Sequence, residues 1–203
     1  MTTEPLFKNS YDALVFAFNY SGQQYGKSPM IKITGTHMPS GKGLSGVDGA
    51  AQAGFIRAEV AAMGRILEAI LIARFAPHTV PCSCRQPCCI GEKPNKEWTE
   101  AVAVLADHLR DNVLKSCVTT WDMRVQYIMR QFTKKGDRVS LEEIARRNNV
   151  SERTVSTHFG IVRAFFNGKK DNSGHVPGIE EVAQIAIEGR LSKIEMIKID
   201  CTV

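Results

Sequence analysis

The sequence predicts a mostly α-helical protein: a helical bundle with a C-terminal helix-turn-helix and a small cysteine-rich loop. Three observations predict this class. Apolar residues recur three and four positions apart through several long stretches, which is the period of a helix with one buried face. Strand signals are few. Segments rich in glycine and proline separate the helical stretches, as expected of loops between helices.

The composition is that of a globular protein with a sizeable core. The chain has 203 residues, of which 43% are hydrophobic and 23% charged, and both fractions are ordinary for a folded protein. No apolar run is long enough to span a membrane, and the N-terminus lacks the pattern of a secretion signal. We therefore expect a cytoplasmic protein with no membrane partner.

Four segments are predicted along the chain. They are an extended N-terminal arm over 1–48, a helical domain over 49–118 with a cysteine-rich loop at 77–95, a helix-turn-helix domain over 119–167, and a linker with C-terminal helices over 168–203. The prolines of the cysteine-rich loop and the polar residues 168–178 exclude regular structure from both places in this interpretation.

Apolar stripes predict the helices outside the helix-turn-helix. One helix is expected from Val47 to Ala76, with Asp48 as its cap and with the stripe Phe55, Met63, Ile66, Ile70 and Leu71. Another begins at Lys96. The next has Thr119 and Asp122 at capping-box spacing and a predicted buried side of Trp121, Val125, Ile128, Met129 and Phe132. In the last segment one face should hold Ile179, Val182, Ile185 and Ala186.

The stretch SLEEIARRNNV predicts the first helix of the helix-turn-helix. Ser140 is expected to cap it, and Glu143 stands at the position that completes a capping box. Leu141, Ile144 and Ala145 should face inward. Ala145 must be small, because the second helix crosses there at close range.

A tight turn and a second helix follow directly. Asn148 or Asn149 can adopt the left-handed conformation of the turn, Val150 should fill the corner, and Ser151 should cap the next helix. Its predicted inner stripe is Val155, Phe159, Val162 and Phe166. The spacing of Ala145, Asn149 and Val155 is that of a helix-turn-helix.

The outer face of this second helix favours DNA as the partner. The N-terminal end of a recognition helix enters the major groove, and the predicted base-reading residues there are Arg153, Thr154, Ser156 and Thr157, with Arg163 as a further candidate. Predicted phosphate contacts are Arg146, Arg147, Lys134, Lys135 and Arg138, since such contacts position a protein without specifying sequence. The alternative is a capped helical hairpin with a solvated charged face, and Glu152 opposes phosphate.

The charge distribution points the same way. Residues 124–170 contain 11 Lys or Arg and 4 Asp or Glu residues, a net charge of +7, whereas the whole chain has +5. The rest of the chain is therefore slightly acidic. Concentrated positive charge is the electrostatic footprint of a nucleic-acid-binding segment.

The cysteine cluster predicts a zinc site. Cys82, Cys84, Cys88 and Cys89 lie within eight residues, and four thiolates suit tetrahedral zinc. The spacing differs from the usual pair of C-x-x-C knuckles, so His78 or Cys117 could replace one cysteine. A closed structural site is expected rather than a catalytic one, because only His78 offers a nearby base. The alternative is a set of partly buried thiols without metal.

Two short motifs resemble a known family. KSPM at 27–30, followed by LSGVD at 44–48, is similar to the N-terminal stretch of the late antitermination protein Q family of lambdoid bacteriophages. Two departures stand beside this resemblance. That family's zinc site resembles two separated C-x-x-C pairs, and the present helix-turn-helix resembles another antiterminator branch, in which it is similar to that of sigma factor region 4.

The resemblance implies a function. Such a protein binds DNA near a late promoter in the host bacterial cytoplasm, loads onto paused RNA polymerase beside its sigma factor, and promotes terminator readthrough. The residues themselves indicate DNA binding only, so an operator-binding transcription regulator is the alternative. A DNA-processing enzyme with a helix-turn-helix for targeting is a third interpretation. No nucleophile or acid–base set supports it, and we do not expect an enzyme.

Overall fold

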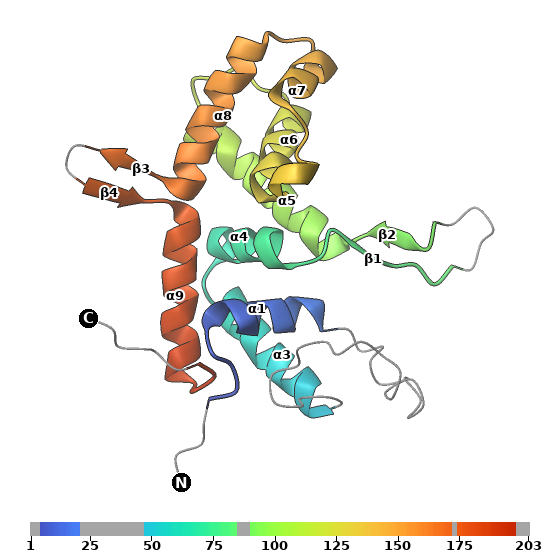
Figure 1. Cartoon of the computed structure of the whole chain (residues 1–203), viewed down its shortest axis with the longest axis vertical. Coiled ribbons are helices and arrows are strands. Elements are labelled where there is room, and N and C mark those ends of the chain that lie inside the picture. Colours follow the sequence, from blue (N-terminus) through green and yellow to red (C-terminus); the bar gives the residue numbers. More distant parts are fainter. Residues whose placement is uncertain (1–4, 21–46, 85–89, 172–173, 198–203) are drawn as a thin grey trace. The chain divides into compact units, whose positions relative to one another are not determined.

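The protein is mostly α-helical (Figure 1). A computed structural model describes residues 5–20, 47–84, 90–171 and 174–197. The predicted arm over 1–48 therefore falls largely outside the described residues, as do Cys88 and Cys89. In the part that is described, no helix combines the length and the apolar character needed to cross a membrane.

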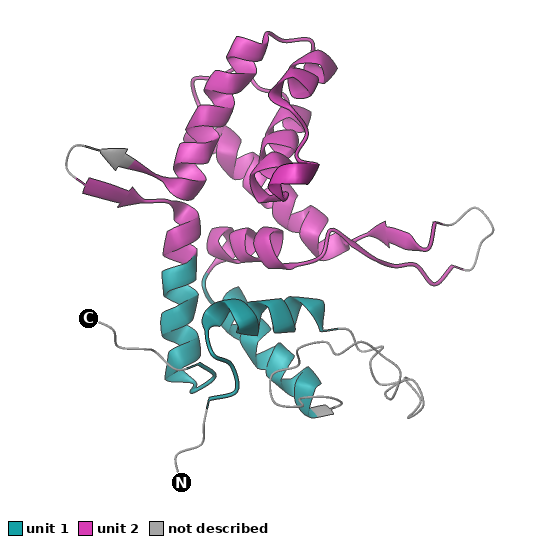
Figure 2. Ribbon diagram, viewed as in Figure 1, with its two compact units in different colours: residues 1–63, 184–203 teal, residues 64–183 magenta. Residues whose placement is uncertain are grey.

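The chain divides into two compact units (Figure 2), residues 1–63 with 184–203 and residues 64–183. Unit 1 contains α1 (Ser10–Asn19), α3 (Val47–Ala61) and the greater part of α9 (Ile179–Lys193). Asn9 caps α1 by accepting a hydrogen bond from the Asp12 amide at 2.8 Å. The core of this unit holds Leu14, Phe18, Ile56, Val60, Ile187 and Leu191.

The prediction of a single helix over 47–76 is wrong, because the structure has two helices in this range. α3 ends at Ala61 and α4 begins at Arg65, after Gly64 with a φ of 90°. That left-handed backbone suits glycine and interrupts the helix. The predicted stripe holds only in part: Ile70 and Leu71 are buried on α4, whereas Phe55 is 58% exposed and α3 buries Ala53, Ile56 and Val60 instead. Asp48 lies inside the first turn of α3 rather than at its cap.

Unit 2 holds the remaining elements. In chain order they are α4 (Arg65–Phe75), β1 (Thr79–Pro81), β2 (Glu92–Pro94), α5 (Lys96–His108), the π-helical turn η3 (Leu109–Val113), α6 (Trp121–Phe132), the short turn η4 (Lys135–Asp137), α7 (Leu141–Asn148), α8 (Glu152–Asn167), β3 (Gly168–Asp171), β4 (Gly174–Pro177) and the start of α9. α5 packs against both α4 and α6, and α8 contacts α6 and α7. The interior of the unit is formed by Ile70, Leu71, Leu105, Leu109, Met123, Tyr127, Ile128 and Phe166.

The buried face of α6 differs from the prediction. Trp121 and Met129 are 48% and 39% exposed, and the helix buries Met123, Arg124, Tyr127, Ile128, Gln131 and Phe132. The cap is Thr120, whose hydroxyl accepts a hydrogen bond from the Met123 amide at 3.2 Å, and not Thr119. The prediction assumed that only apolar residues turn inward, whereas an arginine and a glutamine occupy two of the buried positions.

Both segments predicted to be irregular contain short antiparallel hairpins. β1 pairs with β2, and β3 pairs with β4. The predicted inner face of the last helix is also corrected. α9 buries Ala183, Ile187 and Leu191, whereas Ile185, which was expected on that face, is 62% exposed. The two hairpins extend from unit 2 beside α5 and α8 (Figure 1).

Candidate nucleic-acid interface

α7 and α8 are joined by a three-residue turn with the predicted conformation. Asn149 is left-handed, with φ 52° and ψ 45°, a conformation that asparagine tolerates better than most residues. The Val150 amide donates to the Ala145 carbonyl at 3.1 Å, which is the 6→1 hydrogen bond of a Schellman motif at a helix C-terminus. Ser151 then caps α8 by accepting from the Thr154 amide at 3.1 Å. The turn ends one helix and starts the next with few unpaired backbone groups.

Ser140 caps α7 as predicted, but the capping box is incomplete. The Ser140 hydroxyl accepts from the Glu143 amide at 3.0 Å. The Glu143 carboxylate instead accepts hydrogen bonds from Arg146 at 2.8 Å and from Arg147 at 2.7 Å. Those hydrogen bonds, first from Arg146 and then from Arg147, lower the pKa of the Glu143 carboxyl to about 2.

The side of the pair that faces α6 is closely packed. Ile144 and Ala145 of α7 are buried, as are Val155 and Val162 of α8. Of the other three predicted interior residues, one is buried as expected and two are not. Leu141 and Phe159 are half-buried, and Phe166 is fully buried with its ring 5.2 Å from that of Phe132. Because the inner face of α8 is occupied, its outer face is left for other contacts.

The outer face of α8 presents most of the predicted base-reading residues. Arg153, Ser156, Thr157 and Arg163 are exposed, and Thr154 is half-buried. Arg153 and Arg163 make no ion pair within the described ranges. Two hydroxyls already have intramolecular partners, since Thr154 Oγ1 lies 2.7 Å from Ser151 Oγ and Thr157 Oγ1 donates to the Arg153 carbonyl at 2.9 Å.

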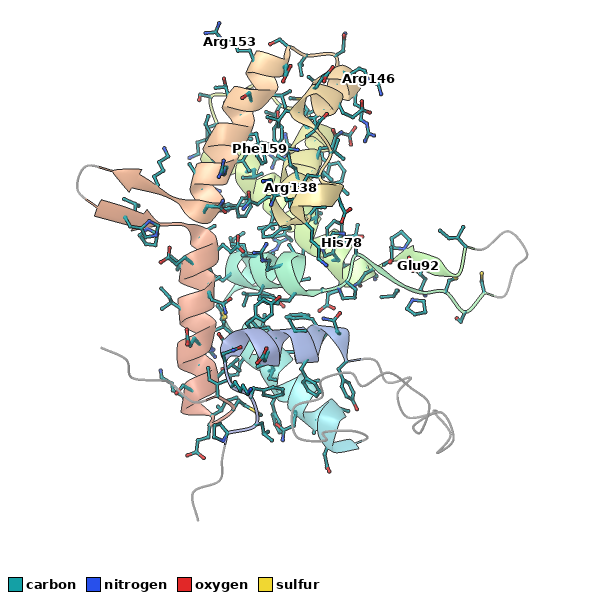
Figure 3. All side chains as sticks on the ribbon, in the orientation of Figure 1. His78, Glu92, Arg138, Arg146, Arg153 and Phe159 are labelled. Atoms are coloured by element: carbon teal, nitrogen blue, oxygen red, sulfur yellow. The ribbon has the colours of Figure 1, made fainter. Side chains whose placement is uncertain are left out.

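The predicted phosphate contacts fall into two groups. Arg146 and Arg147 lie at the C-terminal end of α7, near the start of α8. Lys134, Lys135 and Arg138 are exposed but precede the N-terminus of α7, and the rise along the helix from Leu141 to Arg146 and Arg147 is about 8 Å. Figure 3 shows Arg146 and Arg153 at one end of the pair and Arg138 toward the other.

Two arginines within the basic stretch 124–170 bind backbone carbonyls inside the fold and are not available on the surface. Arg124 is 4% exposed, and it donates to the Ala106 and Thr119 carbonyls, each at 2.9 Å. Arg130 donates to the Val139 carbonyl, and its guanidinium carbon lies 5.2 Å from the centre of the Phe159 ring. Burial lowers the pKa of Arg130. The positive charge available to a partner is therefore smaller than the count over residues 124–170 implies.

Tyr127 of α6 and His158 of α8 form a buried polar pair that the sequence does not predict. The Tyr127 hydroxyl is 3.4 Å from His158 Nδ1, and both side chains are buried. Burial raises the pKa of Tyr127 to about 12 and lowers the pKa of His158. His158 stands at the interior spacing of Val155 and Val162, which is the signal that could have revealed its burial. Both groups are therefore neutral packing partners.

The cysteine-rich loop joins β1 to β2. Cys82 follows β1 directly, and its amide donates to the Gly91 carbonyl at 2.8 Å, so the two ends of the loop are held together. Cys82 is half-buried and Cys84 is exposed. Among the side chains described, no group of three or more His, Cys, Asp or Glu residues could hold a metal, but Cys88 and Cys89 are not among them.

The two substitute ligands lie apart from this loop. The His78 ring packs against that of Trp98 at a tilt of 39°, with centroids 4.2 Å apart, and burial lowers the pKa of His78. His78 precedes β1 whereas Cys82 follows it, and four extended residues separate their Cα atoms by about 13 Å. Cys117 follows η3 and is separated from the loop by α5, whose 13 residues span about 20 Å. Among the described residues, therefore, neither His78 nor Cys117 lies beside Cys82.

Comparison of the chain with protein-family models, with curated proteins and with solved structures finds no match. The functional assignment therefore depends on the geometry of this chain and on its sequence motifs.

Proposed function

We propose that the protein binds double-stranded DNA through the α7–α8 pair, acting as a helix-turn-helix with α8 in the major groove. The observation that carries this proposal is the division of α8 into two sides. Val155 and Val162 pack inward, while Arg153 and Ser156 are exposed near the N-terminal end, which is the end that enters the groove in this class of motif.

The contacts assign different roles to the basic residues. Arg153 has no intramolecular ion pair within the described part of the chain, so its guanidinium is available for a bidentate contact with a guanine edge. Arg146 and Arg147 share the single carboxylate of Glu143, so together they offer about one net positive charge, which suits a phosphate contact. Thr154, Ser156, Thr157 and Arg163 supply further base contacts, and Lys134, Lys135 and Arg138 supply further phosphate contacts.

DNA binding is tested by selection from a pool of randomised duplexes with the purified wild-type protein. Enrichment of one sequence supports the proposal and supplies the cognate site. Arg65 offers a matched control for Arg153, because it is an exposed arginine at the start of α4 in the same unit. Arg65→Ala should enrich the same site as the wild type. Failure of the wild type to enrich any sequence, at every salt concentration, would contradict the proposal.

We further propose that DNA binding serves transcription antitermination. The support is the resemblance of residues 27–30 and 44–48 to the late antitermination protein Q family, and most of these residues lie outside the described ranges. The protein would bind near a late promoter, join paused RNA polymerase beside its sigma factor, and carry it past terminators.

Transcription in vitro separates this function from plain operator binding. The template carries the selected site at a promoter with a pause and a terminator downstream, and the host RNA polymerase is used. Increased readthrough with the wild type, but not with Arg153→Ala, supports antitermination. Tight binding to the site without readthrough would contradict it and favour an operator-binding regulator.

A further inference from the structure

The β3–β4 hairpin is fixed to the end of α8 by two glycines. A Cβ atom on Gly168 would lie 2.2 Å from the Val176 carbonyl oxygen, and one on Gly178 would lie 2.1 Å from the Phe166 carbonyl oxygen. Both distances are far below van der Waals contact, and Gly168 also has a φ of 80°. Only glycine permits this approach, so the base of the hairpin has a defined direction relative to α8.

Apart from its base, the hairpin makes one side-chain hydrogen bond to the helices among the described residues, between His175 of β4 and Glu181 of α9. All four residues of β4 are exposed, and an isolated two-stranded hairpin is marginal in water. A hairpin that is built onto α8 and buries no apolar face of its own is suited to contact something outside the fold.

One face of the hairpin turns away from α9. Directly opposed residues of two antiparallel strands share a face, and successive residues alternate. His175 points toward the first turn of α9, because its Nε2 atom lies 2.7 Å from the Glu181 carboxylate. Lys169 and Val176 oppose each other one position along, so they occupy the other face, and both are exposed.

The hairpin begins directly after the last residue of α8. Asn167, at that end, lies at helical spacing from Arg153 and Arg163 and is exposed, although its side-chain oxygen accepts a hydrogen bond from Gln131 Nε2 of α6. Figure 1 shows the hairpin projecting from the junction of α8 and α9. The 16 residues of α8 span about 24 Å, whereas the major groove is about 12 Å wide. A hairpin at the far end of α8 therefore extends beyond a groove occupied by the N-terminal end.

We propose that Lys169 on the β3–β4 hairpin contacts a phosphate of the same duplex that α8 enters. This inference rests on the proposed function, and it adds a second point of attachment outside the α7–α8 pair. The contact is to the backbone, so it positions α8 without reading sequence.

Salt titration of binding to a mixed-sequence duplex several helical turns long tests the contact. Lys93→Ala is the matched control, because Lys93 is an exposed lysine on β2 of the other hairpin. Lys169→Ala should weaken binding severalfold and lower the salt slope by about one unit. Lys93→Ala should change neither quantity, and Lys169→Arg should restore the slope.

The outcomes separate this inference from the proposed function. A wild-type salt slope in Lys169→Ala, with Arg153→Ala still losing the cognate site, overturns the hairpin contact and leaves DNA binding by α8 intact. Equal losses in Lys169→Ala and Lys93→Ala also overturn it, because net charge alone would then explain both. If the wild-type protein binds no duplex, the proposed function fails and takes this inference with it.

Discussion

Arg124 and Arg153 lie on two helices that pack against each other, yet the fold uses them differently. Arg124 of α6 is 4% exposed and donates to two backbone carbonyls. Arg153 of α8 is exposed and has no ion pair within the described residues. One arginine connects α5 to the start of α6, and the other is available to a partner. A basic stretch of sequence therefore does not measure the positive charge on the surface.

The largest expected effect is the loss of stability when Arg124 of α6 is replaced. Arg124→Ala should lower the free energy of unfolding by about 2–4 kcal/mol, because the carbonyls of Ala106 and Thr119 lose a charged donor and a cavity is left. Denaturant unfolding measures the loss. Arg153→Ala should stay within about 0.5 kcal/mol of the wild type in the same experiment. Equal stability of the two variants would remove the distinction between the arginines.

The packing between α7 and α8 gives the next largest effect. Ala145 is 5% exposed, so Ala145→Leu should force the helices apart and cost about 1–3 kcal/mol. Thermal unfolding and DNA binding should both decline. Ala51→Leu is the control, since Ala51 is exposed on α3. An unchanged midpoint for Ala145→Leu would mean that the two helices do not cross at this residue.

A smaller effect is expected where one carboxylate holds two arginines. Glu143→Gln should release Arg146 and Arg147, tighten binding to mixed-sequence DNA and steepen its salt slope by up to about one unit. Lowering the pH cannot test this simply, because the pKa of Glu143 is about 2 and the carboxylate stays ionised until strong acid. Glu142→Gln removes the same charge from an exposed neighbour without these hydrogen bonds. Identical slopes for both variants would show that only net charge matters.

Removing zinc from the cysteine-rich loop should have the smallest effect on the stability and DNA binding that the two arginines support. We expect one zinc ion per chain, bound by Cys82, Cys84, Cys88 and Cys89. Elemental analysis of protein purified without added metal measures it. Chelation should leave the stability conferred by Arg124 and the DNA binding of α8 nearly unchanged, because the loop joins β1 to β2 whereas the two arginines lie on α6 and α8. A zinc content near zero with freely titrating thiols would rule out the site.

The sequence predicts best where short-range chemistry decides the structure. Ser140, Asn149 and Ser151 act on residues within a few positions, and all three adopt the predicted roles at the ends of α7 and α8. The mostly helical class is likewise confirmed, because the spacing of apolar residues reflects helix geometry directly.

Prediction was poorer where the partner is distant in the chain. The burial of Arg124 depends on the Ala106 carbonyl of α5, and local hydrophobicity contains no sign of it. The β3–β4 hairpin depends on close backbone contact between Gly168 and Gly178, although residues 168–178 are polar enough to resemble a linker. For the candidate site, the outer face of α8 is predicted from helical spacing. The ion pairs of Glu143 with Arg146 and Arg147 have the i,i+3 and i,i+4 spacing of helix pairs, and they are missed because Glu143 is assigned to a capping box.

The most direct test of the account is the affinity of Arg153→Ala for the selected site and for mixed-sequence DNA at several salt concentrations, with Arg65→Ala alongside. We expect Arg153→Ala to lose about 1–3 kcal/mol on the selected site and much less on mixed sequence, with Arg65→Ala matching the wild type on both. An equal loss on both DNAs with a shallower salt slope would contradict base reading by Arg153 and make it a phosphate contact. Wild-type affinity of Arg153→Ala on both DNAs would contradict the placement of α8 in the groove.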